Sequence, residues 1–329
     1  MSKKLIGVDI GGTKCAVCLG EADGQGVQVL QKCTPRATAE YTPNAMIEGL
    51  IADILELTAT LSAPAAGIGI SCGGPLSSRR GLILSPPNLP GWDEIAIVEK
   101  LQQATGLPAW LCNDANACAL AEWKMGAGQG AASMIFMTFG TGLGGGLILN
   151  GRLYEGACDM AGELGHIRLA EDGPIGYGKR GSFEGFCSGG GIARLGQEYA
   201  RSALRRGLAP AFCKTADDLS RITAASVGAA AAVGDATALS VLRHSGERLG
   251  QGLAMLIDLL NPEKIVIGSI FARCHPYLWP AAKSVLEKEC LPEALAACQV
   301  LPAALGDSVG DIAALMIAQY HTESEGTAQ

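Results

Sequence analysis

Apolar residues along the chain follow two patterns: short unbroken runs typical of buried strands, and longer runs with helical spacing. The first unbroken run, residues 4–10, predicts a buried strand with Asp9 near its end, and residues 15–20 and 26–33 predict two more strands. Over residues 43–61 the apolar positions recur at helical spacing, which predicts a helix. The chain is therefore expected to open as a β-meander followed by a helix.

The remaining pattern predicts strands and helices in alternation, which indicates the α/β class. Strands are expected over residues 66–71, 109–111, 132–139, 146–149 and 263–268. Helices are expected over 94–105, 114–125, 276–289 and 308–320, with a mostly helical stretch over 190–260 and a loop over 76–92. The polar tail after His321 is expected to be frayed. A strand, a Gly- and Thr-rich turn and a second strand occur near residue 10 and again near residue 140, which suggests two similar halves with a cleft between them.

Composition narrows the class of protein. The 329 residues are 48% hydrophobic and 17% charged, which excludes a disordered or coiled-coil chain and allows two domains. A formal net charge of −7 argues against a dedicated binder of nucleic acid or of anionic membranes. No apolar run reaches the roughly 18 residues of a membrane span. The twelve cysteines are scattered along the sequence, which favours reduced thiols in a cytoplasmic protein.

Glycine is unusually frequent, at 45 residues, and it occurs in groups that indicate sharp turns or close approach to a ligand. The first group follows Asp9 in the turn Gly11-Gly12-Thr13-Lys14. Its backbone N–H groups could hold a phosphate, and Asp9 could hold a hydrated Mg²⁺ beside it. A plain β-hairpin explains this single turn equally well.

A second Gly-rich turn makes ligand binding the better interpretation of the pair. The run from Thr138 to Gly146 holds five glycines and two threonines in nine residues. So many glycines weaken a strand unless a ligand or another backbone comes close. Two such turns, one in each half, are what a nucleotide-dependent phosphotransferase needs.

Polar residues between the two turns are candidates for sugar chemistry. Asn113 and Asp114 stand between a predicted strand and a predicted helix, where α/β proteins bind ligands, and Asp114 could accept a hydroxyl proton. A helix N-cap is the alternative for Asp114. Glu163, His166 and Glu184 could hold vicinal hydroxyls. A solvated face is the alternative for the two glutamates, and a structural histidine for His166.

Five motifs in order resemble the ROK (repressor, open reading frame, kinase) family. They lie at residues 7–14, 113–117, 139–146, 162–167 and 261–268, so the resemblance spans nearly the whole chain. The resemblance implies the actin-like ATPase fold, with two α/β domains built on ribonuclease-H-like sheets and a closing interdomain cleft. We accordingly expect an N-terminal domain over 1–113, completed by the helix over 308–321. The C-terminal domain, over 114–307, would carry the second phosphate turn and the sugar-binding loop.

The resemblance also implies roles for individual residues. Asp114 would be the base on the sugar hydroxyl, and the residues holding the sugar would be Asn88, Asn113, Asp114, Glu163, His166 and Glu184. ATP and Mg²⁺ would be held by Asp9, Gly11, Gly12, Thr13, Lys14, Thr138, Gly140, Thr141, Gly142, Gly144, Gly145 and Gly268. Asn88 is placed only by the loop that runs from Pro87 to Trp92.

The chain departs from the family at the zinc site. The family usually binds zinc with the histidine and three cysteines of a loop that ends in a glutamate. Here Ile175, Tyr177 and Ser182 stand at the three cysteine positions. Because thiolates are the usual ligands, we predict no structural zinc. A smaller departure is Ser269 after Gly268, where the family often has two glycines.

The leading interpretation is an ATP-dependent kinase of a hexose, acting on the 6-hydroxyl of a glucose-type sugar. The loop from Asn88 to Trp92 resembles that of family glucokinases, with N-acetylmannosamine or another hexose as the alternative substrate. The rival class is the family's sugar-responsive transcriptional regulators, which carry a helix-turn-helix before the first phosphate strand. Only a few residues precede Gly7 here, so no nucleic-acid partner is expected. A sugar-binding protein with decayed catalysis is a third alternative. The expected partners are the hexose and ATP, with no membrane and a possible homodimer.

Overall fold

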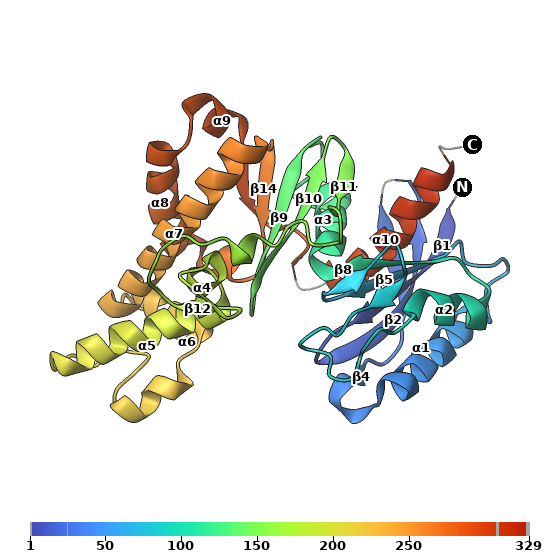
Figure 1. Ribbon diagram of the computed structural model, residues 1–329, viewed down its shortest axis with the longest axis horizontal. Coiled ribbons are helices and arrows are strands. Elements are labelled where there is room, and N and C mark those ends of the chain that lie inside the picture. Colours follow the sequence, from blue (N-terminus) through green and yellow to red (C-terminus); the bar gives the residue numbers. More distant parts are fainter. Residues whose placement is uncertain (1, 25, 307–308, 327–329) are drawn as a thin grey trace. The chain divides into compact units, whose positions relative to one another are not determined.

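The computed structural model of the chain describes residues 2–24, 26–306 and 309–326. The chain divides into two compact units (Figure 1). Unit 1 comprises Met1–Gly130, Gly146–Ala161 and Ala304–Gln329, and unit 2 comprises Ala131–Gly145 and Gly162–Ala303. Unit 1 thus continues beyond residue 113, where the sequence analysis ends the N-terminal domain, because the helix after residue 113 packs against the C-terminal helix. The domain boundaries of the sequence analysis stay a proposal.

Unit 1 is built on a sheet with the strand order β3-β2-β1-β5-β8, and β4 pairs with β2. The strands are β1 (Lys3–Ile10), β2 (Lys14–Ala22), β3 (Val27–Lys32), β4 (Arg36–Ala37), β5 (Ile68–Cys72), β6 (Leu76–Ser77), β7 (Leu82–Ile83), β8 (Ala109–Asn113) and β11 (Arg152–Tyr154). The helices are η1 (Thr38–Glu40), α1 (Pro43–Thr58), α2 (Ile97–Thr105), α3 (Asp114–Met125) and α10 (Val309–Gly326). Strands β1, β5 and β8 are parallel, so Ile10, Cys72 and Asn113 end at one edge of the sheet.

The alternation of side chains along β1 explains how helices cover both faces of this sheet. Ile6 and Val8 face the core formed with α1 and α2. Gly7 faces α10 instead, and a Cβ atom there would lie 3.1 Å from the Cβ of Ala314. Gly69 on β5 also meets α10, because its Cβ would lie 2.0 Å from the carbonyl oxygen of Ala314. Glycines on this face therefore let α10 approach the sheet closely, on the side opposite α1 and α2 (Figure 1).

Unit 2 contains most of a second sheet, whose strand order is β11-β10-β9-β14-β15. The strands are β9 (Met134–Phe139), β12 (Ile175–Gly176), β13 (Lys179–Arg180), β14 (Lys264–Ile267) and β15 (Gln299–Pro302). Strand β10 (Leu143–Leu149) begins in unit 2 and ends in unit 1. The helices are η2 (Leu164–His166), α4 (Phe183–Phe186), α5 (Gly189–Arg205), η3 (Ala216–Arg221), α6 (Ala224–Ala232), α7 (Ala236–Leu260), α8 (Ile270–Glu289) and α9 (Pro292–Ala297). Helices α7 and α8 lie side by side (Figure 1), because a Cβ at Gly246 would be only 2.4 Å from the carbonyl oxygen of Leu278.

Most predicted elements are confirmed, and the mostly helical stretch over 190–260 forms α5, α6 and α7. Two helix starts were predicted wrongly. The helix predicted over 94–105 begins only at Ile97, because Glu94 has a left-handed φ of 50° and Ile95 bridges to Ile83. The helix predicted over 276–289 begins at Ile270 and holds Pro276 and Pro280 in its interior.

Two further differences concern a strand and the C-terminus. The strand predicted over 146–149 begins at Leu143, so part of the second Gly-rich turn is extended strand. The tail after His321 was predicted to be frayed, but α10 continues to Gly326, and Ser324 Oγ donates to Tyr320 O over 2.8 Å. Ser308, the first residue of the predicted last helix, and residues 327–329 lie outside the described residues.

Membrane spans were tested by helix length and hydropathy. Among the described residues, no single helix is both long and apolar enough to cross a bilayer. Helices α6 and α7 meet the criterion only when taken together, and they are bent by 118° at the break between them. All twelve cysteines are free thiols.

Candidate functional site

The first Gly-rich turn joins β1 to β2 as a tight β-hairpin. Ile10 pairs with Cys15, and the Gly11 N–H donates to Lys14 O over 3.0 Å. The Thr38 hydroxyl anchors the turn by donating to Gly11 O over 2.6 Å. The β-hairpin that the sequence analysis gave as the alternative for this turn is therefore present. Phosphate binding by the same turn stays a prediction.

Gly12 brings this turn against the loop that carries Asn88. A Cβ at Gly12 would lie 2.6 Å from Asn88 O and 2.9 Å from Asn88 Cβ. Real side chains do not pack that closely, so the position requires glycine. The predicted phosphate turn and the predicted sugar residue Asn88 are therefore neighbours within unit 1.

Asp9 is half-buried near the end of β1, close to two other carboxylates and to Lys14 and Lys32. Burial and the negative charges of Asp311 and Asp114 raise the pKa of Asp9 to about 6. Asp311, in the first turn of α10, accepts from Lys32 Nζ over 2.6 Å. The sequence analysis missed Asp311, and the only available signal was an acidic residue near the start of the last predicted helix.

The donor set at Asp9 fits Mg²⁺. Mg²⁺ is usually held by one or two carboxylates together with substrate phosphates and water. A cation beside Asp9 would offset the repulsion from Asp311 and Asp114 that raises its pKa. Within the described part of the chain, no group of three or more His, Cys, Asp or Glu side chains is arranged to hold a metal ion.

Asn113, not Asp114, caps helix α3. The Asn113 side chain accepts from the N–H groups of Ala115 and Asn116, over 2.9 and 3.4 Å. Asp114 is the first helical residue, and its Oδ1 accepts from Ala115 N over 2.8 Å. The N-cap alternative for Asp114 is therefore wrong, because the preceding residue takes that role.

The Asp114 carboxylate has the electrostatic character of a base. The residue is exposed, but the protein packed around its carboxylate removes part of its hydration, which raises the pKa above the ordinary value. The bond from Ala115 N opposes this shift without cancelling it. A raised pKa makes the ionised carboxylate a stronger proton acceptor.

Three predicted sugar residues converge around Gly73 and Gly74. A Cβ at Gly73 would lie 3.6 Å from Asn88 Nδ2 and 3.8 Å from Asp114 Oδ2. A Cβ at Gly74 would lie 3.5 Å from Asn113 Nδ2. The two glycines therefore leave space among one carboxylate and two amides, which are good hydrogen-bond partners for hydroxyl groups.

The second Gly-rich turn, in unit 2, is closed by its own threonine. Gly144 N donates to Thr138 Oγ1 over 2.8 Å, and Gly140 N donates to Gly142 O over 3.1 Å. Thr141 is exposed at the tip of the turn. Gly145 has a packing role, since a Cβ there would lie 2.5 Å from Leu164 Cδ1.

Glu184 joins this turn to the predicted sugar-binding segment. Its Oε2 accepts from Leu143 N over 3.1 Å. Gly165 packs against both, because its Cβ would lie 2.1 Å from Leu143 O and 3.2 Å from Glu184 Cβ. Glu163, which precedes η2, and His166, the last residue of η2, are both exposed. Unit 2 therefore brings Glu163, His166, Glu184 and the second turn together.

The loop that carries zinc in the family is ordered here by hydrogen bonds and aromatic packing. Ser182 Oγ donates to Gly176 O over 3.3 Å and accepts from Gly185 N over 3.1 Å. The Tyr177 ring meets the His166 ring edge-on, with centroids 6.4 Å apart. Two residues at the lost cysteine positions thus have contacts of their own, and the absence of zinc stays a prediction.

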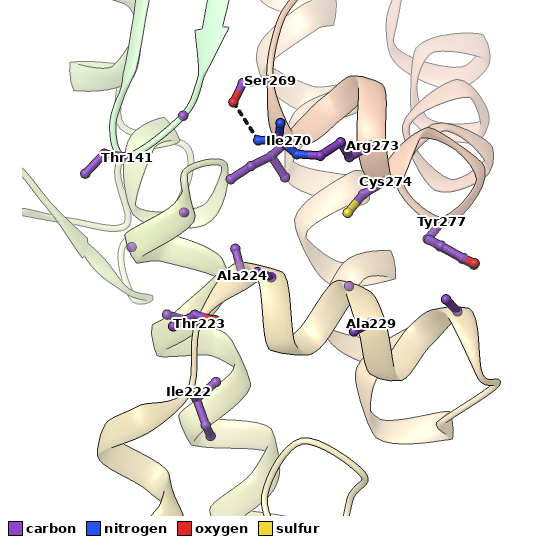
Figure 2. A pocket seen from close by; sticks show the side chains of 17 residues that line it. Thr141, Ile222, Thr223, Ala224, Ala229, Ser269, Ile270, Arg273, Cys274 and Tyr277 are labelled. Atoms are coloured by element: carbon purple, nitrogen blue, oxygen red, sulfur yellow. Dashed lines mark hydrogen bonds between the residues drawn. The ribbon is translucent and has the colours of Figure 1, made fainter. Parts of the chain in front are cut away.

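A pocket of about 780 Å³ lies beside the second turn, entirely within unit 2 (Figure 2). Small residues form much of its wall, and Arg273 and Tyr277 from α8 lie at its side. Arg273 Nη2 donates to Ser269 Oγ over 3.0 Å, the dashed line in Figure 2. The lining residues are Gly140, Thr141, Gly189, Gly190, Ala193, Ile222, Thr223, Ala224, Ala225, Gly228, Ala229, Ala232, Ser269, Ile270, Arg273, Cys274 and Tyr277.

The sequence analysis missed most of this pocket. It named Gly140 and Thr141, and it named Gly268, which immediately precedes the lining residue Ser269. The paired glycines Gly189 and Gly190 were a usable signal, since grouped glycines indicate close approach of backbone or ligand. The alanines of α6 gave no signal, because an alanine-rich helix is equally typical of a packed core.

The sequence comparisons agree: the chain matches the ROK family and is similar to sugar kinases. A sequence model described as "ROK family" matches residues 5–321. The glucokinase of Halalkalibacterium halodurans is 35% identical over 313 residues, covering 93% of this chain and 92% of that protein. The N-acetylmannosamine kinase of Shigella flexneri is 31% identical over 275 residues, covering 83% of this chain and 85% of that protein.

Solved structures of two functional classes resemble the chain. A ROK family glucokinase from Streptomyces griseus in complex with glucose and AMPPNP is 31% identical, with a TM-score of 0.71 over 96% of this chain and 99% of that chain. A ROK family transcriptional regulator, a homologue of the E. coli MLC protein, is 26% identical, with a TM-score of 0.82 over 97% of this chain and 78% of that chain. The predicted α/β, actin-like ATPase fold of the ROK sugar kinases is confirmed.

Proposed function

Because the chain belongs to the ROK family, we propose that it is a sugar kinase that transfers the terminal phosphate of ATP to the 6-hydroxyl of a hexose. The observation that carries this proposal is the position of Asp114. Its carboxylate lies at the sheet edge beside two amide side chains, and it is released from helix capping by Asn113. That arrangement suits a proton acceptor rather than a structural cap.

Asp114 acts as the general base in this proposal. Its carboxylate accepts the proton of the 6-hydroxyl as the sugar oxygen attacks the terminal phosphate. Asn88 and Asn113, which face the same space, bind and orient neighbouring hydroxyls. Orientation of this kind supplies much of the rate, because a hydroxyl held in line needs no further ordering.

The two Gly-rich turns are assigned to the phosphates. Gly11, Gly12, Thr13 and Lys14 of the first turn and Thr138 to Gly145 of the second would surround the phosphates. The donors would include the Thr13 and Thr141 hydroxyls and the Lys14 ammonium, whereas the N–H groups of Gly11, Gly140 and Gly144 donate within the turns themselves. Mg²⁺ held beside Asp9 would neutralise charge on the phosphates. Burial and the nearby carboxylates of Asp311 and Asp114 raise the pKa of Asp9 to about 6, and a cation beside Asp9 would offset both effects, which supports this assignment.

The nucleotide base and ribose are assigned to the pocket in unit 2. Its volume of about 780 Å³ is within the range of ordinary small-molecule sites, roughly 300–1,000 Å³. The tip of the second turn, Gly140 and Thr141, lines the pocket, so a nucleotide bound there would direct its phosphates to that turn. Gly268 supports the pocket through the adjoining Ser269.

Glu163, His166 and Glu184 are assigned to the remaining sugar hydroxyls. Glucose is the leading substrate because the two relatives that are glucokinases span nearly all of this chain. N-acetylmannosamine is the second candidate, since a kinase of that sugar is almost as similar. Because ATP and reduced thiols belong to the cell interior, we place the enzyme in the cytoplasm, with a homodimer as a possible assembly.

A coupled assay with ATP, Mg²⁺ and a panel of hexoses tests the proposal. We expect turnover with at least one hexose, and glucose and N-acetylmannosamine should differ clearly. A sugar-responsive regulator needs to bind its sugar but has no use for a base beside the hydroxyl. A chain that binds a hexose in calorimetry but phosphorylates none of the panel would overturn the kinase assignment and favour the regulator.

A further inference from the structure

Glu122 is a buried acidic residue for which the proposed mechanism has no use. It lies in α3 and is 0% exposed. Its Oε2 accepts from Ala127 N over 2.9 Å and from Ala304 N over 3.2 Å, and its Oε1 accepts from Leu305 N over 2.8 Å. One carboxylate therefore binds two segments that are far apart in sequence, through backbone N–H groups alone.

The main chain around Glu122 is adapted to this arrangement. The carbonyl oxygen of Glu122 accepts from Gly126 N over 3.0 Å and from Gly128 N over 2.9 Å. The side chain folds back over Gly126, where a Cβ would lie 2.0 Å from Glu122 Oε2. Glycine at 126 is therefore required by the carboxylate rather than by its own backbone angles.

Both bound segments adjoin points where the chain passes between its two units. The chain leaves unit 1 after Gly130, returns after Gly145, leaves again after Ala161 and returns after Ala303. Ala127 precedes the first of these crossings, and Ala304 and Leu305 directly follow the last. All the atoms that bind Glu122 belong to unit 1.

We infer that Glu122 is a positioning residue for phosphoryl transfer, which fixes the unit 1 ends of the first and last crossings. The inference rests on the proposed function, in which the reaction uses Asp114 of unit 1 and the second turn of unit 2. A misplacement of about 1 Å can lower a reaction rate by about a hundredfold. Loosening both crossings together should therefore slow the chemistry more than it weakens binding.

Glu122→Gln is the direct test, because glutamine has nearly the same shape. In one orientation the glutamine NH₂ group would face the N–H of Leu305, and in the other it would face the N–H groups of Ala127 and Ala304. Because an NH₂ group cannot accept from an N–H donor, at least one hydrogen bond is lost in either case. We expect kcat to fall at least tenfold, which corresponds to about 1.4 kcal/mol. The dissociation constant for adenosine, which has no phosphates, should stay within twofold, because the pocket assigned to the base and ribose lies wholly in unit 2.

Asp53→Asn is the matched control. Asp53 is 8% exposed in unit 1, and its Oδ1 accepts from Arg36 Nη2 over 2.6 Å, away from the crossings. Both substitutions remove one buried carboxylate from unit 1, so both should lower Tm, but Asp53→Asn should leave kcat within twofold. The inference would be overturned if the two variants lost the same Tm and also the same kcat. It would also be overturned if Glu122→Gln kept full kcat.

Gly126→Ala and hydrogen exchange keep the test decisive if Glu122→Gln folds poorly. The alanine methyl displaces the carboxylate but leaves its charge, so we expect the same selective loss of kcat. Amide exchange should accelerate in both the 126–128 and the 304–305 segments of either variant, and acceleration in only one segment would contradict a shared anchor. This readout is independent of turnover. If the unaltered chain phosphorylates no hexose, the proposed function fails, while the anchoring by Glu122 is still judged by exchange.

Discussion

Replacing Asp114 by asparagine separates a catalytic base from a structural residue. The change keeps the shape of the side chain and an oxygen that can accept from Ala115 N, now 2.8 Å from Asp114 Oδ1. It removes the negative charge and, with it, the ability to take up a proton. Because Asn113 already caps α3, the substitution should leave the helix unchanged.

The size of the expected effect follows from the role. Loss of a general base costs about 10²–10⁴ in rate, or about 2.7–5.5 kcal/mol. The pKa of Asp114 is raised in the folded chain, so ionisation of this group opposes folding as pH rises past its ordinary value. An asparagine side chain does not ionise and carries no such penalty, so we expect the Tm of Asp114→Asn at neutral pH to equal or exceed that of the unaltered chain.

The assay compares kcat, hexose affinity by calorimetry and Tm on the same preparations, with the best hexose of the panel. We expect kcat to fall at least a hundredfold, hexose binding to persist within a few-fold and Tm not to drop. Asn113→Ala provides the contrast, since loss of an N-cap costs about 0.5–2 kcal/mol of stability. An Asp114→Asn variant that keeps half or more of the original kcat would refute the general-base role.

The remaining predictions concern pH, sugar affinity and zinc. In a profile of kcat against pH, kcat should fall at low pH, because Asp114 must be ionised to accept a proton. The midpoint of this fall should lie above the ordinary aspartate pKa of 3.8, because the pKa of Asp114 is raised, and a midpoint at or below 3.8 would contradict this. Glu163→Ala should raise the hexose KM roughly tenfold, since a charged hydrogen bond contributes about 1.5–3 kcal/mol, and should leave nucleotide affinity unchanged. Glu184→Ala should weaken both, because Glu184 also accepts from Leu143 N of the second turn, and calorimetry showing equal effects of the two substitutions would count against these roles. Elemental analysis should find no zinc, whereas one zinc per chain, with unfolding on chelation, would show that other side chains replace the missing thiolates.

The sequence predicts elements well where local pattern and packing agree. Helix α3 runs over residues 114–125 as predicted, because its start is marked by a capping side chain and its end by Gly126. Prediction failed at α8, where Pro276 was taken for a first helical residue. The helix keeps both prolines because one buried stripe continues past them, formed by Phe271, Cys274, Leu278, Ala282 and Leu286. Burial of that stripe outweighs the hydrogen bonds that proline cannot make.

In the candidate site, too, local motifs predicted some residues, whereas residues that depend on distant parts of the chain were missed. Motifs pointed to the residues around Gly73 and to the second turn, because glycine and carboxylate patterns carry local information. They did not reveal Asp311, the alanine wall of the pocket that we assign to the nucleotide, or Glu122, because each depends on partners far away in sequence. A glutamate in the last turns of a helix looks like an ordinary surface residue until the fold shows that it is 0% exposed.

We predict that the loop without cysteines binds no zinc, so its order must come from contacts of its own. Structural zinc contributes about 10–16 kcal/mol in zinc-finger peptides, whereas a hydrogen bond contributes about 0.5–1.5 kcal/mol net. The two bonds of Ser182 therefore cannot replace the metal alone. Phe183 is 0% exposed and lies so close to α7 that a Cβ at Gly252 would be 2.2 Å from its ring, and burial of such a side chain contributes about 1.5–3 kcal/mol. The order of the segment that carries Glu184 thus depends on the core of unit 2, so substitutions that loosen α7 should weaken sugar binding although they do not contact the site.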